Sequence, residues 1–288
     1  MDYFLIQGKG YLGYLSNLPK LLKEIRRLNP QVIHAHYGYS GLLSCMQNQV
    51  PVVCTFHGSD IHFLRNRIFS FLVSRLTKQN IFVNKSQPIQ LKYNKDINLI
   101  PCGVDLDVFQ PVSNKYEIKK KLQIDPRKKI ILFSSSFDNA IKNFSLAKES
   151  ISLMGKNVEL KEMKNFSRSE VNLWMNACDA LLVTSHYESG PLVVKEAMAS
   201  NCPIVSVDVG NVRELIQDVS YCETVERDSH KIAFALKKII DCDKRTNGRL
   251  KLKKLKVGID EVATVIFDIY QKMTRNGKNS GHRNQTTF

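Results

Sequence analysis

Two glutamates in the second half of the chain are spaced as groups that could hold a phosphorylated sugar. Glu188 lies in a short loop after the apolar segment 180–184, and Glu196 follows after seven intervening residues, inside a helix that Gly190-Pro191 begins. Proline is favoured at the first helical position, and the N-terminus of such a helix directs free N–H groups and the positive end of the helix dipole beyond the strand. A phosphate would bind at this helix, and the two carboxylates could accept hydrogen bonds from sugar hydroxyls. On residue type alone, Glu196 could instead be a solvent-facing helix residue.

A histidine in the first half of the chain occupies a comparable place. His57 follows the apolar segment 51–56, and open α/β sheets bind ligands at the carboxyl ends of their strands. The position therefore favours a ligand contact, with a histidine that only bridges turn atoms as the alternative. Asp60 is expected to orient the same loop or the histidine. His34 and His36 lie on an earlier strand, where we expect only one of them to face a ligand and favour structural roles for both.

These side chains need a scaffold that brings strand ends together. Short apolar segments rich in β-branched residues alternate with amphipathic stretches of helical period, which is the βαβ pattern of an α/β protein with parallel sheets. The predicted strands are 32–34, 51–56, 81–83, 97–100, 130–135, 158–160, 180–184 and 203–207. The predicted helices are 14–27, 41–47, 68–78, 115–122, 146–153, 168–177, 192–199, 212–217, 231–240 and 261–272. Ser167 and Glu170 have the spacing of a capping box at the start of one of them.

The glutamate pair resembles the donor-site signature of the retaining glycosyltransferases of family 4, which have the GT-B fold. The second glutamate is followed by Ala197-Met198-Ala199 and then by Pro203-Ile204-Val205-Ser206. Further segments agree with the family in order and spacing, and the resemblance covers nearly all of residues 1–273. They are His34-Ala-His-Tyr-Gly38, Thr55-Phe-His-Gly-Ser-Asp60, Ile100-Pro-Cys-Gly-Val-Asp105 with Phe109 and Pro111, Asn176-Ala-Cys-Asp-Ala180 and Asp208-Val-Gly-Asn-Val-Arg-Glu214.

The resemblance implies roles for individual residues. Glu196 would bind the ribose hydroxyls of a nucleotide, Glu188 the hydroxyls of the donor sugar, and His57 would approach that sugar. The family's diphosphate-binding Lys is matched by Lys142, whereas its Arg is absent and the corresponding place falls near Phe137. Lys142, the helix N-terminus and the hydroxyls of 134–136 would then stabilise the charge of the leaving group. The donor-binding set also includes Asn143 and the backbone of Ser189, Gly190, Pro191 and Leu192.

The same resemblance predicts two Rossmann-like domains that face each other across a cleft. The break in periodicity at 101–114 places residues 1–112 in an N-terminal, acceptor-side domain and residues 113–256 in a nucleotide-sugar-binding domain. A helix over 257–274 is expected to return toward the first domain, and the polar residues 275–288 are expected to form a flexible tail. The N-terminal domain is expected to be incomplete, because the family's first strand, glycine-rich turn and helix would precede the segment that Met1 begins.

The function implied by the resemblance is transfer of a hexosyl-type sugar from a nucleotide-diphosphate sugar to a hydroxyl acceptor, with retention at the anomeric carbon, in surface polysaccharide or glycolipid assembly. Because the donor is a substrate, we expect no cofactor. We expect no metal site either, since no group of His, Cys, Asp and Glu has metal-ligand spacing. The alternatives are a catalytically silent homologue that only binds nucleotide and a nucleotide-sugar epimerase of the same fold.

Composition limits the class of protein and its partners. Of 288 residues, 43% are hydrophobic and 24% charged, no apolar run is long enough to span a membrane, and the first residues do not resemble a signal peptide, so we expect a cytoplasmic globular chain. The net charge of +15 fits an anionic surface at the inner face of the plasma membrane, with a carbohydrate or lipid-linked acceptor, or simply a solvated basic face. Nucleic acid is not expected, because the basic clusters 115–129 and 244–256 lack the interleaved aromatics of single-strand binding sites.

Overall fold

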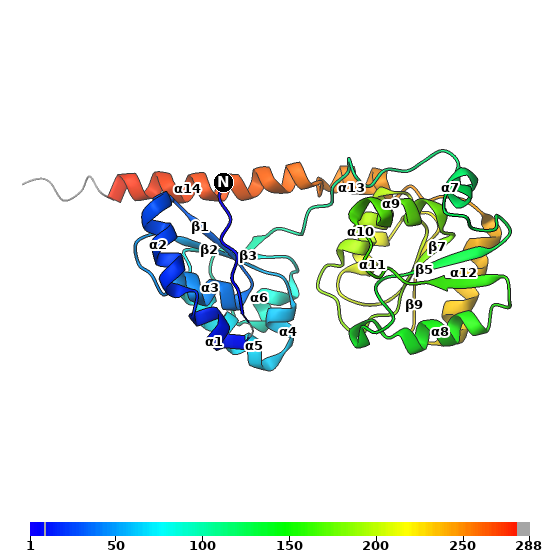
Figure 1. The fold of residues 1–288 in the computed structure, drawn as a ribbon, viewed down its shortest axis with the longest axis horizontal. Coiled ribbons are helices and arrows are strands. Elements are labelled where there is room, and N and C mark those ends of the chain that lie inside the picture. The colour runs from blue at the N-terminus through cyan, green and yellow to red at the C-terminus, as the bar shows by residue number, and fades with distance from the viewer. Residues whose placement is uncertain (9, 281–288) are drawn as a thin grey trace, which may run out of the picture. The chain divides into compact units, whose positions relative to one another are not determined.

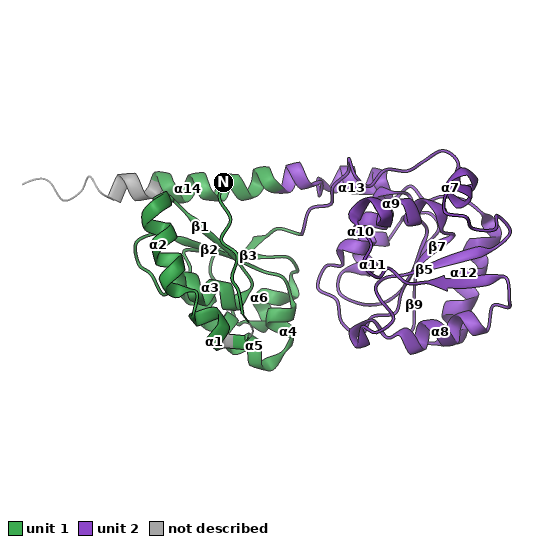
Figure 2. Cartoon of the chain, in the orientation of Figure 1, with its two compact units in different colours: residues 1–101, 263–288 green, residues 102–262 purple. Residues whose placement is uncertain are grey.

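The chain folds into two compact units. The computed structural model describes residues 1–8 and 10–280. Unit 1 comprises Met1–Pro101 and the chain from Ala263 onward, and unit 2 comprises Cys102–Val262 (Figures 1 and 2). Each unit has its own parallel sheet.

Unit 1 is built on a four-stranded parallel sheet of order β1-β2-β3-β4. Its strands are β1 (Ile33–His36), β2 (Val52–Phe56), β3 (Gln79–Phe82) and β4 (Asn98–Leu99). The helices are α1 (Gly10–Leu15), α2 (Leu18–Leu28), α3 (Gly38–Cys45), α4 (Ser59–His62), α5 (Leu64–Leu76) and α6 (Ser86–Gln90). Every residue of β2 is buried, as expected of a parallel strand covered on both faces.

Unit 2 contains a five-stranded parallel sheet of order β6-β5-β7-β8-β9. Its strands are β5 (Lys129–Phe133), β6 (Val158–Lys161), β7 (Ala180–Val183), β8 (Ile204–Val207) and β9 (Cys222–Val225). The helices are α7 (Lys115–Lys121), α8 (Phe144–Ser152), α9 (Arg168–Ala177), α10 (Leu192–Ala199), α11 (Val212–Ile216), α12 (Ser229–Cys242) and α13 (Gly248–Leu255), with a 3₁₀ turn η1 (Ala140–Lys142). The predicted capping box at the start of α9 is confirmed.

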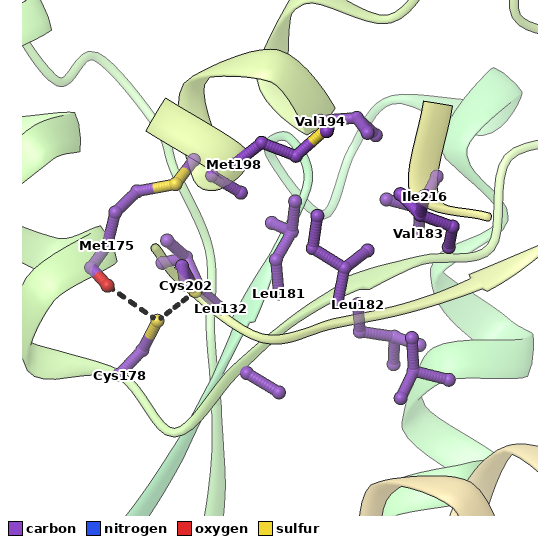
Figure 3. Close-up of a cluster of buried hydrophobic side chains, with 14 of the residues drawn as sticks. Leu132, Met175, Cys178, Leu181, Leu182, Val183, Val194, Met198, Cys202 and Ile216 are labelled. Carbon is purple, nitrogen blue, oxygen red and sulfur yellow. Dashed lines mark hydrogen bonds between the residues drawn. The ribbon is translucent and has the colours of Figure 1, made fainter. Parts of the chain in front are cut away.

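A continuous apolar core holds the unit 2 strands in place. Leu132 of β5 and Leu181 and Leu182 of β7 are fully buried with Val194 and Met198 of α10 (Figure 3). Protein cores pack as tightly as organic crystals. This packing therefore fixes the positions of the strand ends from which the loops of unit 2 leave.

The segment between the two sheets belongs to unit 2, whereas the sequence places residues 1–112 in the first domain. Val104 pairs with Gly258 in a parallel bridge, and the Arg249 guanidinium donates hydrogen bonds to the carbonyls of Leu106 at 2.8 Å and Phe109 at 2.5 Å. These contacts fix residues 104–109 against α13, so contacts divide the chain after Pro101.

The last helix, α14 (Ile259–Ser280), is longer than the predicted helix over 257–274. It continues through the first residues of the predicted tail 275–288, and the remainder of that tail, 281–288, lies outside the described residues. Its residues from Ala263 belong to unit 1. Within residues 1–8 and 10–280, no helix has the length and apolar character needed to span a bilayer.

Candidate functional site

The strand order of unit 2 reverses between β5 and β7. The chain passes from β5 outward to β6 and then returns to the other side of β5 as β7. Open α/β sheets bind ligands where the strand order reverses in this way, beyond the carboxyl ends of the two strands. Lys142 lies in the connection that leaves β5, and Glu188 lies in the connection that leaves β7.

Lys142 and Glu188 meet at this position. The Lys142 ammonium donates to Oε1 of Glu188 at 2.6 Å, and the two side chains are only 18% and 12% exposed. The Ser185 hydroxyl donates to the same carboxylate oxygen at 2.7 Å. A cation and a carboxylate are therefore held together with little access to water, which strengthens the interaction of both with any further charged group.

Three hydrogen bonds join the two connections that carry Lys142 and Glu188. The Thr184 hydroxyl donates to the carbonyls of Lys142 at 2.8 Å and Asn143 at 3.1 Å, and the His186 N–H donates to the carbonyl of Ile141 at 2.8 Å. Asn143 has a positive φ of 55°, which asparagine tolerates better than most residues. Sequence reasoning selected Lys142 and Asn143 but missed Thr184, which follows β7 directly.

Gly210 supports the Glu188 loop from a neighbouring connection. It has a φ of +59°, and a Cβ at this position would lie 2.8 Å from the carbonyl oxygen of Glu188. Both the backbone conformation and the close approach therefore require glycine. Arg227 also holds this region, because its guanidinium donates to the carbonyls of Thr184 and His186.

Helix α10 begins directly after the segment Ser189-Gly190-Pro191. Helix α10 confirms the predicted range 192–199, although Pro191 is its N-cap residue and not its first helical residue, which is Leu192. The N–H groups of Leu192 and Val193 precede any intrahelical acceptor and can donate to an anion, whereas the N–H of Val194 donates to the Pro191 carbonyl at 3.2 Å. Lys195 faces inward instead: it is buried and donates to the carbonyl of Cys102 at 2.6 Å.

Glu196 lies on the second turn of α10 in a partly desolvated position. Burial raises the pKa of its carboxyl from 4.5 to about 7, and the nearby positive charge of Arg168 opposes this shift. The Glu196 carboxylate accepts no hydrogen bond from any residue that the structure describes. A carboxylate so placed would gain from hydroxyl donors supplied by a ligand.

The position near Phe137, where the resemblance places an arginine that this sequence lacks, is apolar. The Phe137 ring stacks on Phe144 at a centroid distance of 4.2 Å and lies 5.6 Å from the ring of Phe133. The Phe137 N–H donates to Glu162. Of the three neighbouring serines, Ser134 is buried and Ser136 donates to Asp138. Lys142 is thus the cation that this stretch of chain brings to Glu188.

Unit 1 places a histidine cluster at the carboxyl ends of β1 and β2. Nδ1 of His36 and Nε2 of His57 are 2.9 Å apart, and the rings of His34 and His36 stack at 4.5 Å. His34 Nδ1 lies 2.5 Å from the Tyr270 hydroxyl of α14. The expectation that only one of His34 and His36 could face a ligand is wrong, because residues i and i+2 of a strand lie on the same face.

The histidine cluster is uncharged at neutral pH. Burial, with repulsion from neighbouring imidazoles, lowers the pKa of His34 to about 3 and that of His57 to about 4. Asp60 orients the loop rather than the ring, since its carboxylate accepts a hydrogen bond from the N–H of Gly58 at 2.7 Å. Among the described residues, no group of three or more His, Cys, Asp or Glu is arranged to hold a metal ion.

Comparison with known proteins agrees with this organisation. Residues 2–108 match the family model described as Glycosyltransferase Family 4, and residues 154–254 match the model described as Glycosyl transferases group 1. A relative from Bacillus subtilis, the putative teichuronic acid biosynthesis glycosyltransferase TuaC, is 27% identical over 229 residues. That alignment covers 69% of this chain and 58% of the relative, so the chain spans less than two thirds of the relative's length.

Solved structures confirm the predicted fold class. Sucrose-phosphate synthase from Thermosynechococcus elongatus superposes with a TM-score of 0.81 at 17% sequence identity, over 95% of this chain and 81% of that one. Anabaena Alr3699/HepE in complex with UDP-glucose superposes with a TM-score of 0.77 at 14% identity, over 94% of this chain and 85% of that one. Both units are α/β, as the βαβ pattern predicts.

Proposed function

Because this chain belongs to glycosyltransferase family 4 and has the GT-B fold, we propose that it transfers a sugar from a nucleotide-diphosphate sugar to a hydroxyl acceptor. The anomeric configuration of the sugar is retained and the sugar is a hexosyl unit. The single observation that carries the proposal is the contact of Lys142 with Glu188 at the point where the strand order of unit 2 reverses.

Each group at this position has a part in the proposed reaction. Departure of a nucleoside diphosphate builds negative charge on its outer phosphate, and the Lys142 ammonium and the N-terminus of α10 stabilise that charge. Glu188 accepts hydrogen bonds from the donor sugar, while Ser189, Gly190, Pro191 and Leu192, with Asn143, line the sugar and diphosphate. Neither carboxylate is assigned as a covalent nucleophile.

Glu196 binds the ribose of the nucleotide in this proposal. Its carboxylate is partly desolvated and has no hydrogen-bond donor among the described residues, so two vicinal hydroxyls would satisfy it. His57 contacts the donor sugar through an uncharged imidazole, since its pKa lies near 4. The donor and the acceptor are both substrates, and the proposed reaction uses no cofactor.

The acceptor is a carbohydrate or a lipid-linked hydroxyl in surface polysaccharide or glycolipid assembly. The teichuronic acid enzyme among the relatives supports this setting, and the net charge of +15 suits work beside anionic lipid. We place the protein in the cytoplasm, at the inner face of the plasma membrane.

Titration calorimetry with UDP, ADP and GDP, beside a sugar-transfer assay on membrane acceptors, tests the proposal. The wild type should bind one nucleoside diphosphate and release it from the matching nucleotide sugar only when acceptor is present, and NMR of the product should show retention. Lys142→Ala should abolish transfer and Glu196→Ala should weaken nucleotide binding. Lys148→Ala, an exposed lysine of α8, serves as the matched control.

Two other outcomes correspond to the alternatives. Nucleotide binding without transfer would identify a nucleotide-binding homologue, an outcome that the apolar place of Phe137 favours because the diphosphate then has one cation fewer. Turnover without acceptor would identify an epimerase or hydrolase. Absence of nucleotide binding would overturn the assignment of the site.

A further inference from the structure

Helix α5 of unit 1 turns large apolar side chains outward. Leu64, Ile68, Leu72 and Leu76 are 66%, 58%, 46% and 62% exposed. Their spacing of four residues places all of them along one side of the helix. An ordinary surface helix of a globular protein shows polar residues on that side.

The opposite side of α5 is built from small residues that fix its orientation. Ser70, Val73 and Ser74 are buried, and the Ser70 hydroxyl donates to the carbonyl of Asp60 at 2.8 Å. Helix α3 approaches this side through Gly41, where an added Cβ would lie 2.9 Å from Cys54 Sγ and closer still to Val73. The helix cannot rotate its leucines into this contact, because there is no room for them.

Positive charge accompanies the apolar side chains. Arg65 and Arg75 lie on the same exposed side, and the Arg75 guanidinium sits 3.4 Å above the centroid of the Phe71 ring. The sequence contains no Asp or Glu from Ile61 to Lys95. We define the α5 face as Leu64, Arg65, Ile68, Leu72, Arg75 and Leu76.

We propose that the α5 face is the surface on which the protein rests against an anionic lipid membrane. This inference rests on the membrane setting in the proposed function and assigns it to one helix. Helices that lie in the membrane interface insert an apolar face at the acyl boundary and place Arg and Lys among anionic headgroups. The α5 face offers both features on one side of one helix.

A second copy of the chain fits this surface less well. In a two-fold symmetric contact the same patch faces itself, which would bring Arg65 and Arg75 of each copy together. The α5 face and the segment around it have no carboxylate to neutralise them. Anionic lipid supplies the opposite charge directly.

Vesicle sedimentation with the full chain tests the proposal, using phosphatidylglycerol/phosphatidylcholine vesicles and pure phosphatidylcholine vesicles without donor or acceptor. The wild type should bind the anionic vesicles, and more weakly as salt is raised. The triple variant Leu64→Ser/Ile68→Ser/Leu72→Ser should lower the partition coefficient at least about tenfold. Arg65→Gln/Arg75→Gln should lower it about fivefold per charge at low salt.

The matched control is Phe234→Ser/Lys237→Gln on α12 of unit 2, where Phe234 is 73% exposed. This variant should bind vesicles like the wild type. All variants are exposed-surface changes, and thermal unfolding with nucleotide titration checks that each is folded. Anionic vesicles that fail to bind the wild type, or α5 variants that bind as the wild type does, would overturn the proposal.

A third result would also overturn it. If the α5 variants convert a dimer to a monomer in sedimentation velocity while vesicle binding persists, the α5 face is a contact between copies. Failure of the proposed reaction is distinguishable from both, because Lys142→Ala should abolish transfer and leave vesicle binding unchanged. Vesicle binding thus tests the role of the α5 face and does not depend on the sugar-transfer reaction.

Discussion

The carboxyl ends of the strands carry opposite chemistry in the two units. In unit 1, β1 and β2 lead to the stacked rings of His36 and His57, and burial lowers the pKa of both. In unit 2, β5 and β7 lead to the charged pair of Lys142 and Glu188. The same topological position therefore offers uncharged ring nitrogens in one unit and full charges in the other. The uncharged edge of the unit 1 sheet is suited to hydroxyl groups, and the charged edge of the unit 2 sheet is suited to a diphosphate.

Acid should destabilise unit 1 more than unit 2. A group whose folded-state pKa is lowered contributes stability above its unfolded pKa and loses it as pH falls through the folded value. For His34 that interval runs from 6.5 to about 3, which corresponds to a total loss on the order of 5 kcal/mol, of which about 3 kcal/mol falls above pH 4.5. Guanidinium unfolding is followed at pH 7.5 and 4.5 by circular dichroism, which reports both units, and by fluorescence of Trp174, the single tryptophan, which lies in unit 2. Between the two pH values, the unfolding midpoint should fall more by circular dichroism than by fluorescence.

The matched variants for the acid experiment are His34→Gln and His230→Gln, the second on the exposed side of α12. Glutamine keeps hydrogen-bonding capacity toward Tyr270 and Thr55 but does not titrate, so His34→Gln should reduce the acid loss. Equal acid shifts of both signals in the wild type would contradict the assignment of the effect to unit 1.

Removal of the charge in unit 2 should have the next largest effect. Lys142→Ala should lower kcat about 100- to 1000-fold, because deletion of one preorganised group that stabilises developing charge costs this much in other enzymes. Stability should also fall, because the loss of Lys142 leaves the Glu188 carboxylate, only 12% exposed, without its cation, so thermal unfolding is measured beside the kinetics. Steady-state kinetics against Lys148→Ala measures the difference, and a change below tenfold would remove Lys142 from the proposed mechanism.

Glu196 should show a smaller effect that depends on pH. Its folded-state pKa is raised from 4.5 to about 7, so its contribution to stability is present below pH 4.5 and is lost as pH rises toward 7. At pH 8, Glu196→Gln should therefore be more stable than the wild type by about 3 kcal/mol at most. Near pH 4.5 the two should be alike, and chemical unfolding at both pH values measures this.

The same variant should bind nucleotide sugar more weakly. The wild type should gain about tenfold in affinity between pH 6 and 8 as the carboxyl ionises, while Glu196→Gln should show no such dependence. Glu159→Gln, an exposed residue of β6, is the control. A wild-type affinity that does not change with pH would show that Glu196 does not bind the ribose.

The smallest expected effect concerns the ring that His57 contacts. His36→Ala removes the partner 2.9 Å from His57 Nε2 and should lower kcat about tenfold by leaving the orientation and tautomer of His57 unset. His36→Asn, which retains a hydrogen-bonding group, should recover part of the loss. A change confined to thermal stability would show that His36 is only structural.

The unit 2 site was accessible from sequence because its parts are local. Glu188, Pro191 and Glu196 lie in one strand–loop–helix segment, and the helix dipole and strand end follow from that segment alone. The support provided by Gly210 and Arg227 depends on connections that follow other strands, so no local pattern reveals it. Strand β9 (Cys222–Val225) was also missed, because its half-buried polar residues hide the apolar pattern.

Elements without a conventional amphipathic pattern were the ones that sequence reasoning misjudged. The sequence marks helix α13 (Gly248–Leu255) only as part of a basic cluster, although Arg249 donates to backbone carbonyls and Leu252 is buried. The sequence predicts a helix over 68–78, but α5 starts at Leu64 and its apolar side faces solvent. Which side of a helix is buried depends on its neighbour, here the glycines of α3.

The position of α14 affects how the chain reaches its native state during synthesis. Unit 1 is assembled from residues up to Pro101 and from residues from Ala263 onward, with Tyr270 against His34. A ribosome makes all of unit 2, which ends at Val262, before it makes the part of α14 that belongs to unit 1. Domains generally fold as units during synthesis, so unit 2 can fold first although it is second in sequence. The strands of unit 1 can complete their packing only after α14 has been made. Unit 1 is therefore the part of the chain that most needs a chaperone.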